Sequence, residues 1–246
     1  EDIFIGGAHR QEAKIFLSND NELIEKSNES FEIDSKNEDM ESIFIDIDND
    51  NDLDLYVVSG GNEFNNRSIE LADRIYLNDG KGNFKRDTQE DLQNYTISGK
   101  TVIEIDYDND GDSDIIVGNR IQTKKYPIHE PSIIYENISG KFYNNTYNIA
   151  PEFENFGIVN KVIKTDFNND GWDDFIAVGE WTNIGLFLNE NGKFRDISNE
   201  SNLENTYGLW FNVIETDINN DGLNDYLIGN IGENSKYKTS IDKPLK

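Results

Sequence analysis

The sequence contains no cysteine and only two histidines, His9 and His129. Without cysteine, disulfide bridges and thiolate metal sites are excluded. Two histidines argue against a zinc site built from several imidazoles. No apolar run approaches the roughly 18 residues that a membrane helix needs, so membrane insertion is not expected.

Basic residues are also scarce. The 246 residues include 22 Lys and Arg against 49 Asp and Glu, for a formal net charge of −27. Nucleic acids and anionic membrane surfaces require clustered basic side chains, so neither is expected as a partner. The acidic residues do not form one block, as they would in a disordered tail. They recur in short clusters between apolar runs, which indicates ion sites in a folded chain.

Four nine-residue segments share one pattern and define an internal repeat. They cover residues 46–54, 106–114, 166–174 and 217–225, and their first residues are 60, 60 and 51 positions apart. We call these segments loops 1 to 4 and number the positions of each loop from 1 to 9. One such segment alone is an ordinary turn sequence, but four in register indicate a repeated structural unit.

Short apolar runs flank the loops. Residues 102–105 precede loop 2 and residues 115–117 follow it, and both runs are rich in β-branched side chains, which predicts buried strands. A second hairpin then follows, with Gly and Asn in its turn, as at residues 78–82 and 189–192. These residues supply the positive φ of tight turns. Each unit is therefore predicted to contain four strands.

The predicted fold is all-β, a β-propeller of four-stranded antiparallel blades joined by Asp-rich loops. We expect one propeller segment over residues 1–246. Its complete blades lie at about 40–88, 100–147 and 160–198, and its partial blades at 1–30 and 211–231. Residues 2–6 match residues 114–118, so the first blade is expected to open midway. This match, and a first residue other than methionine, predict a partial propeller from a longer polypeptide.

The loops have the donor pattern of a calcium site. Calcium takes six to eight oxygen ligands at about 2.3–2.6 Å. Positions 1, 3, 5 and 9 carry Asp or Asn, position 6 is a turn residue, and position 7 is expected to offer its backbone carbonyl. Position 9 is always Asp and is expected to make a two-oxygen contact. Four calcium sites are therefore predicted, with the ligands Asp46, Asp48, Asp50, Asp52, Asp54, Asp106, Asp108, Asp110, Asp112, Asp114, Asp166, Asn168, Asp170, Trp172, Asp174, Asp217, Asn219, Asp221, Leu223 and Asp225.

Two alternatives bear on these loops. An EF-hand loop needs Glu at position 12 and helices on both sides, but position 12 here is Val57, Val117, Ala177 or Ile228. Ordinary solvated turns are the other alternative. Loops 1 and 2 carry four carboxylates at positions 1, 3, 5 and 9, whereas Asn168 and Asn219 leave three in loops 3 and 4. Calcium is therefore expected to bind more tightly to loops 1 and 2. Asn51 replaces Gly at position 6 of loop 1, and Asn tolerates left-handed φ.

The loop pattern, followed by an apolar strand and Gly, resembles the FG-GAP/VCBS repeat of integrin-type propellers. Further segments resemble a bacterial branch of these proteins, related to ASPIC/UnbV and cartilage-acidic-protein-like proteins; they are residues 59–64, 73–84, 178–181, 229–232 and 236–238. The resemblance implies a calcium-binding propeller, often seven-bladed, in an exported or surface-attached protein. Adhesion and glycan handling are the functions it suggests.

The expected function is a binding or adhesion module for a glycan or protein partner, not an enzyme. His9 and His129 lack a recognisable nucleophile beside them. Multi-carboxylate loops fill where calcium is near-millimolar, so an extracellular, periplasmic or cell-surface location is expected. Two alternatives stay open: a calcium-dependent, lyase-like enzyme acting on polysaccharides, and a purely structural part of a larger surface protein.

Long connections between strands are the natural recognition elements. Residues 61–73 and 119–131 form longer connections than residues 180–183. Trp181, Trp210 and Tyr207 could stack on a sugar ring or fill gaps between blades, and the packing role is favoured.

Overall fold

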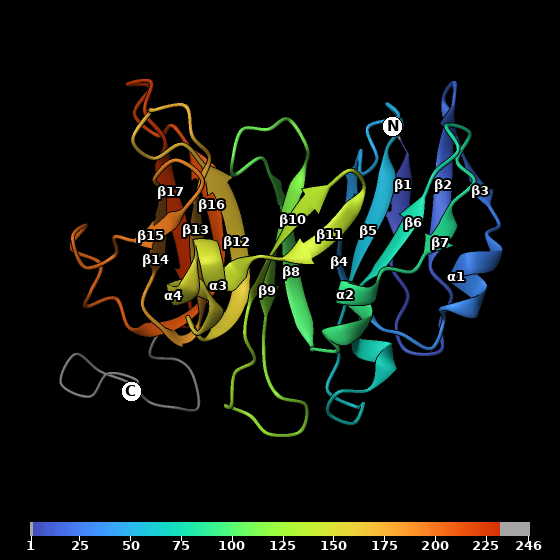
Figure 1. Cartoon of the computed structure of the whole chain (residues 1–246), viewed down its shortest axis with the longest axis horizontal. Coiled ribbons are helices and arrows are strands. Elements are labelled where there is room, and N and C mark those ends of the chain that lie inside the picture. Colours follow the sequence, from blue (N-terminus) through green and yellow to red (C-terminus); the bar gives the residue numbers. More distant parts are fainter. Residues whose placement is uncertain (1, 232–246) are drawn as a thin grey trace.

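The computed structural model describes residues 2–231, and the resemblance noted at residues 236–238 lies outside them. The regular structure of the described chain is mostly β-strand (Figure 1). The first sheet contains β1 (Ile3–Ile5), β2 (Lys14–Asn19) and β3 (Glu22–Lys26). The second contains β4 (Asp39–Ile45), β5 (Asp54–Ser59), β6 (Arg74–Leu77) and β7 (Lys85–Asp87). The third contains β8 (Gly99–Ile105), β9 (Asp114–Asn119), β10 (Ile133–Ile138) and β11 (Lys141–Asn144).

The fourth sheet contains β12 (Ile158–Thr165), β13 (Asp174–Thr182), β14 (Gly185–Asn189) and β15 (Phe194–Asp196). A last hairpin, β16 (Gly208–Thr216) and β17 (Asp225–Asn230), joins this sheet because β16 pairs with the end of β13. All of these pairings are antiparallel, and each strand of the second and third sheets pairs with the next in sequence. The predicted all-β architecture of four-stranded antiparallel sheets is confirmed.

Apolar sequence runs become the second strands. Every residue of β5 and of β9 is buried, because each strand has a neighbouring strand on both edges and a packed sheet on both faces. A strand covered on both faces has no reason to alternate apolar and polar residues. This burial explains the continuous run of residues 55–58.

The core lies between successive sheets. Phe31, Leu55 and Tyr76 pack between the first and second sheets, while Ile47, Tyr56 and Phe142 pack between the second and third. Comparable clusters lie at the next two interfaces. The first strands β4, β8, β12 and β16 are neighbours in space, so the sheets follow one another in a row like the blades of a propeller (Figure 1).

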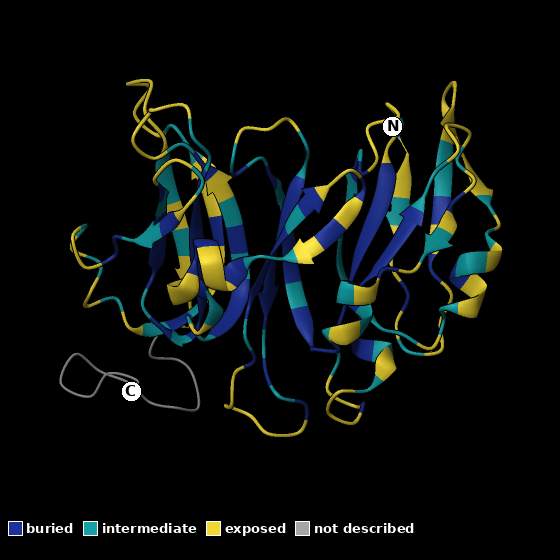
Figure 2. Cartoon of the chain, viewed as in Figure 1, coloured by how far each residue is buried: buried dark blue, intermediate teal, exposed yellow. Residues whose placement is uncertain are grey.

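The two ends of the row are less covered than its middle, as Figure 2 shows. Ile3 and Ile5 of β1 and Phe211, Ile214 and Leu227 of the last hairpin are exposed. Within residues 2–231 the first sheet and the last hairpin lie at opposite ends of the row (Figure 1), and no strand pairing joins them.

Helices are confined to the connections. They are α1 (Glu29–Ile33), α2 (Glu90–Asn94), α3 (Thr146–Ile149), α4 (Pro151–Glu154) and the 3-10 turn η1 (Ile69–Leu71). None of the described helices has the length and apolar character needed to cross a membrane.

Candidate metal centre in the Asp-rich loops

Each of loops 1 to 4 connects the first and second strands of a sheet, so all four lie at the same end of the strands (Figure 1, upper edge). Two positions in every loop have left-handed backbone. Position 6 was predicted to need it, and Asn51 adopts a φ of 70°, close to the 92°, 86° and 84° of the glycines at this position. Position 4, an Asn in all four loops, has φ between 56° and 62°. Asn and Gly are the residues that accept this conformation most readily.

Backbone N–H groups fold the loops around the carboxylates. One oxygen of the position 1 Asp accepts the N–H of position 6 in every loop, at 3.0 to 3.2 Å. One oxygen of the position 5 Asp accepts the N–H of position 7, at 2.8 to 3.0 Å. These contacts fix the carboxylates at positions 1 and 5 against the backbone of their own loop.

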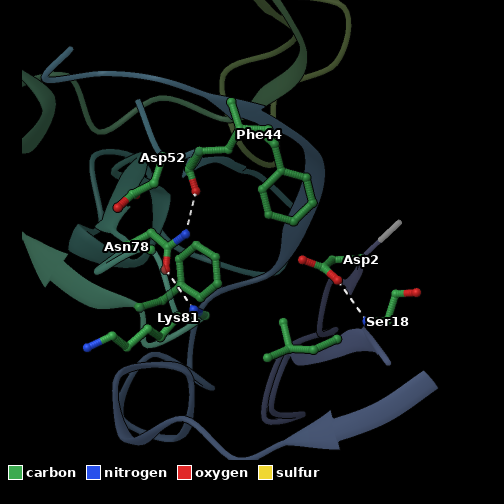
Figure 3. A pocket seen from close by; sticks show the side chains of 11 residues that line it. Asp2, Ser18, Phe44, Asp52, Asn78 and Lys81 are labelled. Atoms are coloured by element: carbon green, nitrogen blue, oxygen red, sulfur yellow. Dashed lines mark hydrogen bonds between the residues drawn. The ribbon is translucent and has the colours of Figure 1, made fainter. Parts of the chain in front are cut away.

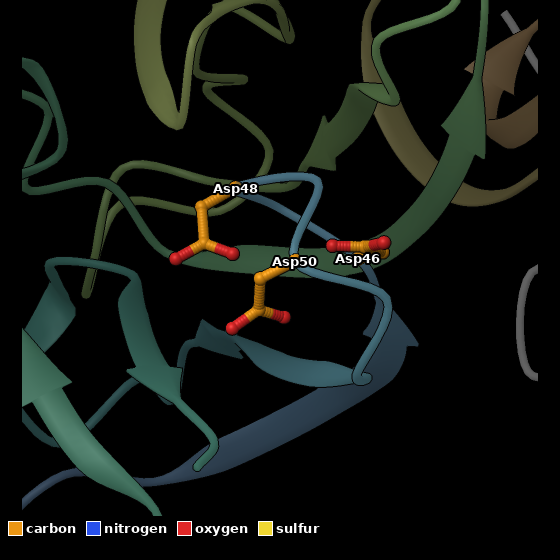
Figure 4. Close-up of side chains that lie close together, drawn as sticks. All are labelled: Asp46, Asp48 and Asp50. Carbon is orange, nitrogen blue, oxygen red and sulfur yellow. The ribbon is translucent and has the colours of Figure 1, made fainter. Parts of the chain in front are cut away.

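In loops 1 and 2 the carboxylates gather. Oxygens of Asp46, Asp48 and Asp50 all lie within 4.8 Å of one another (Figure 4), and so do oxygens of Asp106, Asp108 and Asp114. Several oxygens of these two loops are buried and accept no hydrogen bond; they are Oδ1 of Asp46, Asp52 and Asp106. A buried carboxylate oxygen without a partner is costly, and a hard cation that prefers oxygen ligands would satisfy it. The residues of loops 1 and 2 therefore fit calcium.

Loops 3 and 4 satisfy their polar atoms differently. The amide of Asn168 donates to Asp170 at 2.7 Å and accepts the backbone N–H of the same residue. Asn219 repeats both contacts with Asp221 in loop 4. The amide at position 3 thus compensates part of the charge that a cation would otherwise balance. Residues 167–171 of loop 3 and 218–224 of loop 4 are exposed, and Trp172 and Leu223 stand at position 7.

The position 9 carboxylates have a second role that the sequence did not indicate. Asp54, Asp114 and Asp174 are buried, and each accepts the backbone N–H of position 2 and of the residue at the end of the third strand. Burial raises their pKa values, to about 6 for Asp54 and Asp174 and about 8 for Asp114. These aspartates therefore tie the loop to the third strand.

Three asparagines at the end of the third strands were missed as site residues. Asn78 and Asn189 were assigned to turns, because Asn and Gly there are ordinary turn formers, and Asn137 was not singled out. Asn137 donates to Ile47 O of the preceding sheet's loop at 2.9 Å and to Ser113 O of its own loop at 3.1 Å. Asn189 makes the same pair of contacts one sheet later, with Tyr107 O and Asp173 O. The signal that could have found them is an Asn that recurs after every third strand with a Gly three or four residues later.

The turns beyond Asn137 and Asn189 lie against the preceding loops. A Cβ on Gly140 would lie 3.2 Å from Cβ of Asp48, and one on Gly192 would lie 3.5 Å from Cβ of Asp108. Loops 1 and 2 also contact each other, since Asn49 Nδ2 donates to Asp112 Oδ1 at 2.6 Å. Loops 1 and 2 are therefore built from two neighbouring sheets.

The long connections lie at the opposite end of the strands (Figure 1, lower edge). A cavity of about 190 Å³ opens there between the second and third sheets, lined by Glu38, Glu63 and Arg120 among others. Arg120 pairs with Glu180 at 2.7 Å, and Glu180 also accepts the hydroxyl of Tyr126 at 3.0 Å.

The aromatic residues noted in the sequence divide into two groups. Trp181 is partly exposed, with φ of 63°, and its indole N–H donates to Tyr126 Oη at 2.7 Å. Trp210 packs between the fourth sheet and the last hairpin, as the favoured interpretation expected. Tyr207 is exposed. His9 Nδ1 lies 2.6 Å from Lys36 O, with its ring against Phe64.

Comparisons with known proteins agree with this architecture. The family model described as FG-GAP-like repeat matches residues 46–117 and 166–228, which include all four loops. The chain is similar to a solved structure of an Agrocybe aegerita lectin, with 16% identity and a TM-score of 0.55. That lectin is described as specifically recognising non-reducing terminal N-acetylglucosamine. The similarity covers 92% of this chain and 56% of the lectin chain, so this chain spans little more than half of that structure. None of the curated proteins matches the sequence.

Proposed function

The chain belongs to the FG-GAP-like repeat family, and on that premise we propose that it is a calcium-binding recognition module that acts outside the cytoplasm. The observation that carries the calcium assignment is the pair of three-carboxylate groups in loops 1 and 2, together with their unpartnered buried oxygens. Calcium would be held by side chains at positions 1, 3, 5 and 9 and by the carbonyl of position 7. Bound there, it supplies positive charge that offsets crowded carboxylates and so stabilises the sheets that the loops join.

A calcium titration tests this assignment. Calorimetry on chelator-treated protein should show calcium uptake, and the melting temperature should rise with calcium. Asp48→Asn and Asp108→Asn should each weaken one site. Asp20→Asn is the matched control, since Asp20 is exposed in the β2–β3 turn and far from the loops in sequence. Absence of uptake together with an unchanged melting temperature would contradict the proposal.

The bacterial branch related to ASPIC/UnbV and an extracellular, periplasmic or cell-surface location belong to the same proposal. Loops open to solvent retain calcium best where the ion is near-millimolar, as it is outside cells. Fractionation of the source cells with an antibody to the chain tests the location. Recovery of the protein from the cytosol alone would refute it.

For the partner we propose a glycan bound at the end opposite the loops. Tyr126 is 44% exposed, and a ring contact and a hydrogen bond place Trp181 beside it. Glu180 accepts the hydroxyl of Tyr126 and forms an ion pair with Arg120. Aromatic faces with charged groups nearby suit pyranose rings, which offer both C–H faces and hydroxyl groups. The lectin with the similar fold is described as recognising terminal N-acetylglucosamine, so glycans with this terminus are the first probes.

A glycan array with the wild-type chain and Trp181→Ala tests the partner. Binding should be lost in Trp181→Ala and retained in Tyr147→Ala, since Tyr147 is a highly exposed aromatic residue on α3. Equal binding by both variants would remove the glycan assignment. We propose recognition without catalysis, and release of unsaturated products from a uronate polysaccharide would favour the lyase-like alternative instead.

A further inference from the structure

The first sheet is built like the later ones but presents only three strands among the described residues. Asp2 immediately precedes β1, as position 9 begins β5, β9 and β13. Its Oδ1 accepts the N–H of Ser18, at the end of β2, at 2.7 Å. Asp54, Asp114 and Asp174 make the equivalent contact at 2.7 to 2.8 Å. Asp2 therefore occupies position 9 of the repeat, and β1 to β3 correspond to the second, third and fourth strands of a sheet.

Loops 1 and 2 each pack against the next sheet through the residue at position 2. Ile47 of loop 1 is fully buried beside Tyr135 and Phe142 of the third sheet. Tyr107 of loop 2 is 3% exposed and lies 6.2 Å from the ring of Phe194 in the fourth sheet. In both cases the asparagine of the next sheet donates to the carbonyl of this apolar residue.

The second sheet has the same asparagine, glycine turn and phenylalanine, but among the described residues no loop of a preceding sheet packs against them. Asn78 Oδ1 accepts the N–H of Gly82, as Asn137 and Asn189 accept those of Gly140 and Gly192. Phe84 follows this turn as Phe142 and Phe194 follow theirs. Yet among residues 2–231 the amide of Asn78 donates to Leu53 O of its own loop and to no carbonyl of a preceding loop.

A cavity of about 720 Å³ lies where that loop would be (Figure 3). Its walls include Asp2 and Leu17 of the first sheet and Asn78, Gly82 and Phe84 of the second. Next to the cavity, β1 pairs with β2 on one edge and has no partner on its other edge within the described chain, and Ile3 and Ile5 are 43% and 51% exposed. An unpaired edge strand offers backbone N–H and C=O groups to an added strand.

We propose that this cavity and the free edge of β1 form a docking site for a strand-and-loop segment of the same repeat type. Its strand adds to β1, and its Asp-rich loop enters the cavity with an apolar second residue against Leu17 and Phe84. The carbonyl of that residue accepts the unused N–H of Asn78. The contacts are apolar and backbone-mediated, so docking does not depend on calcium.

A synthetic peptide of residues 99–113, which contains β8 and most of loop 2, is the probe. Labelled peptide titrated into the whole chain in the presence of chelator should bind saturably. A peptide with Tyr107→Ser keeps the charge but loses the apolar second residue, and it should bind at least tenfold more weakly. Absence of binding, or equal binding of both peptides, overturns the proposal.

Two tryptophan variants locate the binding. Ser18 is exposed and lines the cavity, so Ser18→Trp should fill it and abolish peptide binding. Glu152 is exposed on α4 and does not line the cavity, so Glu152→Trp should bind as the wild type does. Both variants should keep the wild-type melting temperature.

Sedimentation of the chain alone completes the test. Self-association that Ser18→Trp abolishes would assign the cavity to a second copy of the chain and overturn the proposed occupant. Because the peptide is titrated without calcium, its failure to bind is distinguishable from a failure of the calcium proposal, which the separate calcium titration decides.

Discussion

Loops 1 and 2 differ from loops 3 and 4 although the four share one sequence pattern. The second residues Ile47 and Tyr107 are 0% and 3% exposed, whereas Phe167 and Ile218 are 42% and 59% exposed. The first pair is covered by the next sheet and held by its asparagine, while the second pair faces no complete sheet within the described chain. Carboxylate groups of three also gather only in loops 1 and 2 among residues 2–231. Loop sequence therefore provides the ligands, and the neighbouring sheet provides their enclosure.

The largest expected difference in folding stability between the loops comes from the Asp at position 9. Asp114→Ala leaves the N–H groups of Tyr107 and Asn137 without acceptors in a buried setting, and each such group costs about 1–3 kcal/mol. Asp225 is partly exposed and accepts the N–H of Ile218, so Asp225→Ala should cost about 1 kcal/mol or less. Urea unfolding in chelator measures both losses. Equal losses would show that the two loops are held alike.

Replacing the asparagines at the ends of the third strands should give a smaller difference in folding stability. Asn137→Ala removes hydrogen bonds to Ile47 O, Ser113 O and Gly140 N in a buried site. We expect a loss of about 2–3 kcal/mol, at about 1 kcal/mol for each bond. Asn78→Ala is the matched control, because Asn78 is partly exposed and contacts only its own loop through its amide nitrogen.

Hydrogen exchange separates these two variants. Asn137→Ala should speed exchange in loops 1 and 2 together, since Asn137 contacts both. Asn78→Ala should affect loop 1 and leave loop 2 as in the wild type. An unchanged loop 1 in Asn137→Ala would refute the contact between sheets as a stabilising interaction.

The position 9 carboxylates also make the free energy of unfolding depend on pH. Burial raises the pKa of Asp114 from 3.8 to about 8, so between these values the folded state holds a proton that the unfolded state has lost. Stability of the calcium-free chain should therefore fall as pH rises from about 4 to about 8. Asp114→Asn should flatten this fall over the whole range.

Asp54→Asn is the comparison for the pH profile, since the pKa of Asp54 is raised only to about 6. Its replacement should flatten the profile below about pH 6 and leave the higher range unchanged. Urea unfolding in chelator at intervals of half a pH unit measures both profiles. Identical profiles for the two variants would contradict the different pKa values of Asp54 and Asp114.

Much of the fold could be predicted because it is local. The Asn and Gly turn residues, the apolar runs that became β5 and β9, and the positive φ of Asn51 all follow from preferences of neighbouring residues. The short helices in the connections were not predicted, since four or five residues carry too little periodicity to be recognised.

The sequence by itself determined where the four loops lie, which residues in them carry oxygen, and that strands flank each loop. Only the tertiary structure decided which oxygens come together and which loops are enclosed. The reason is distance along the chain: Asn137 contacts Ile47 across 90 residues, and Asn78 meets Asp54 across 24. Such contacts depend on how whole sheets stack. A local sequence pattern does not specify which distant residues will lie beside it in the folded chain.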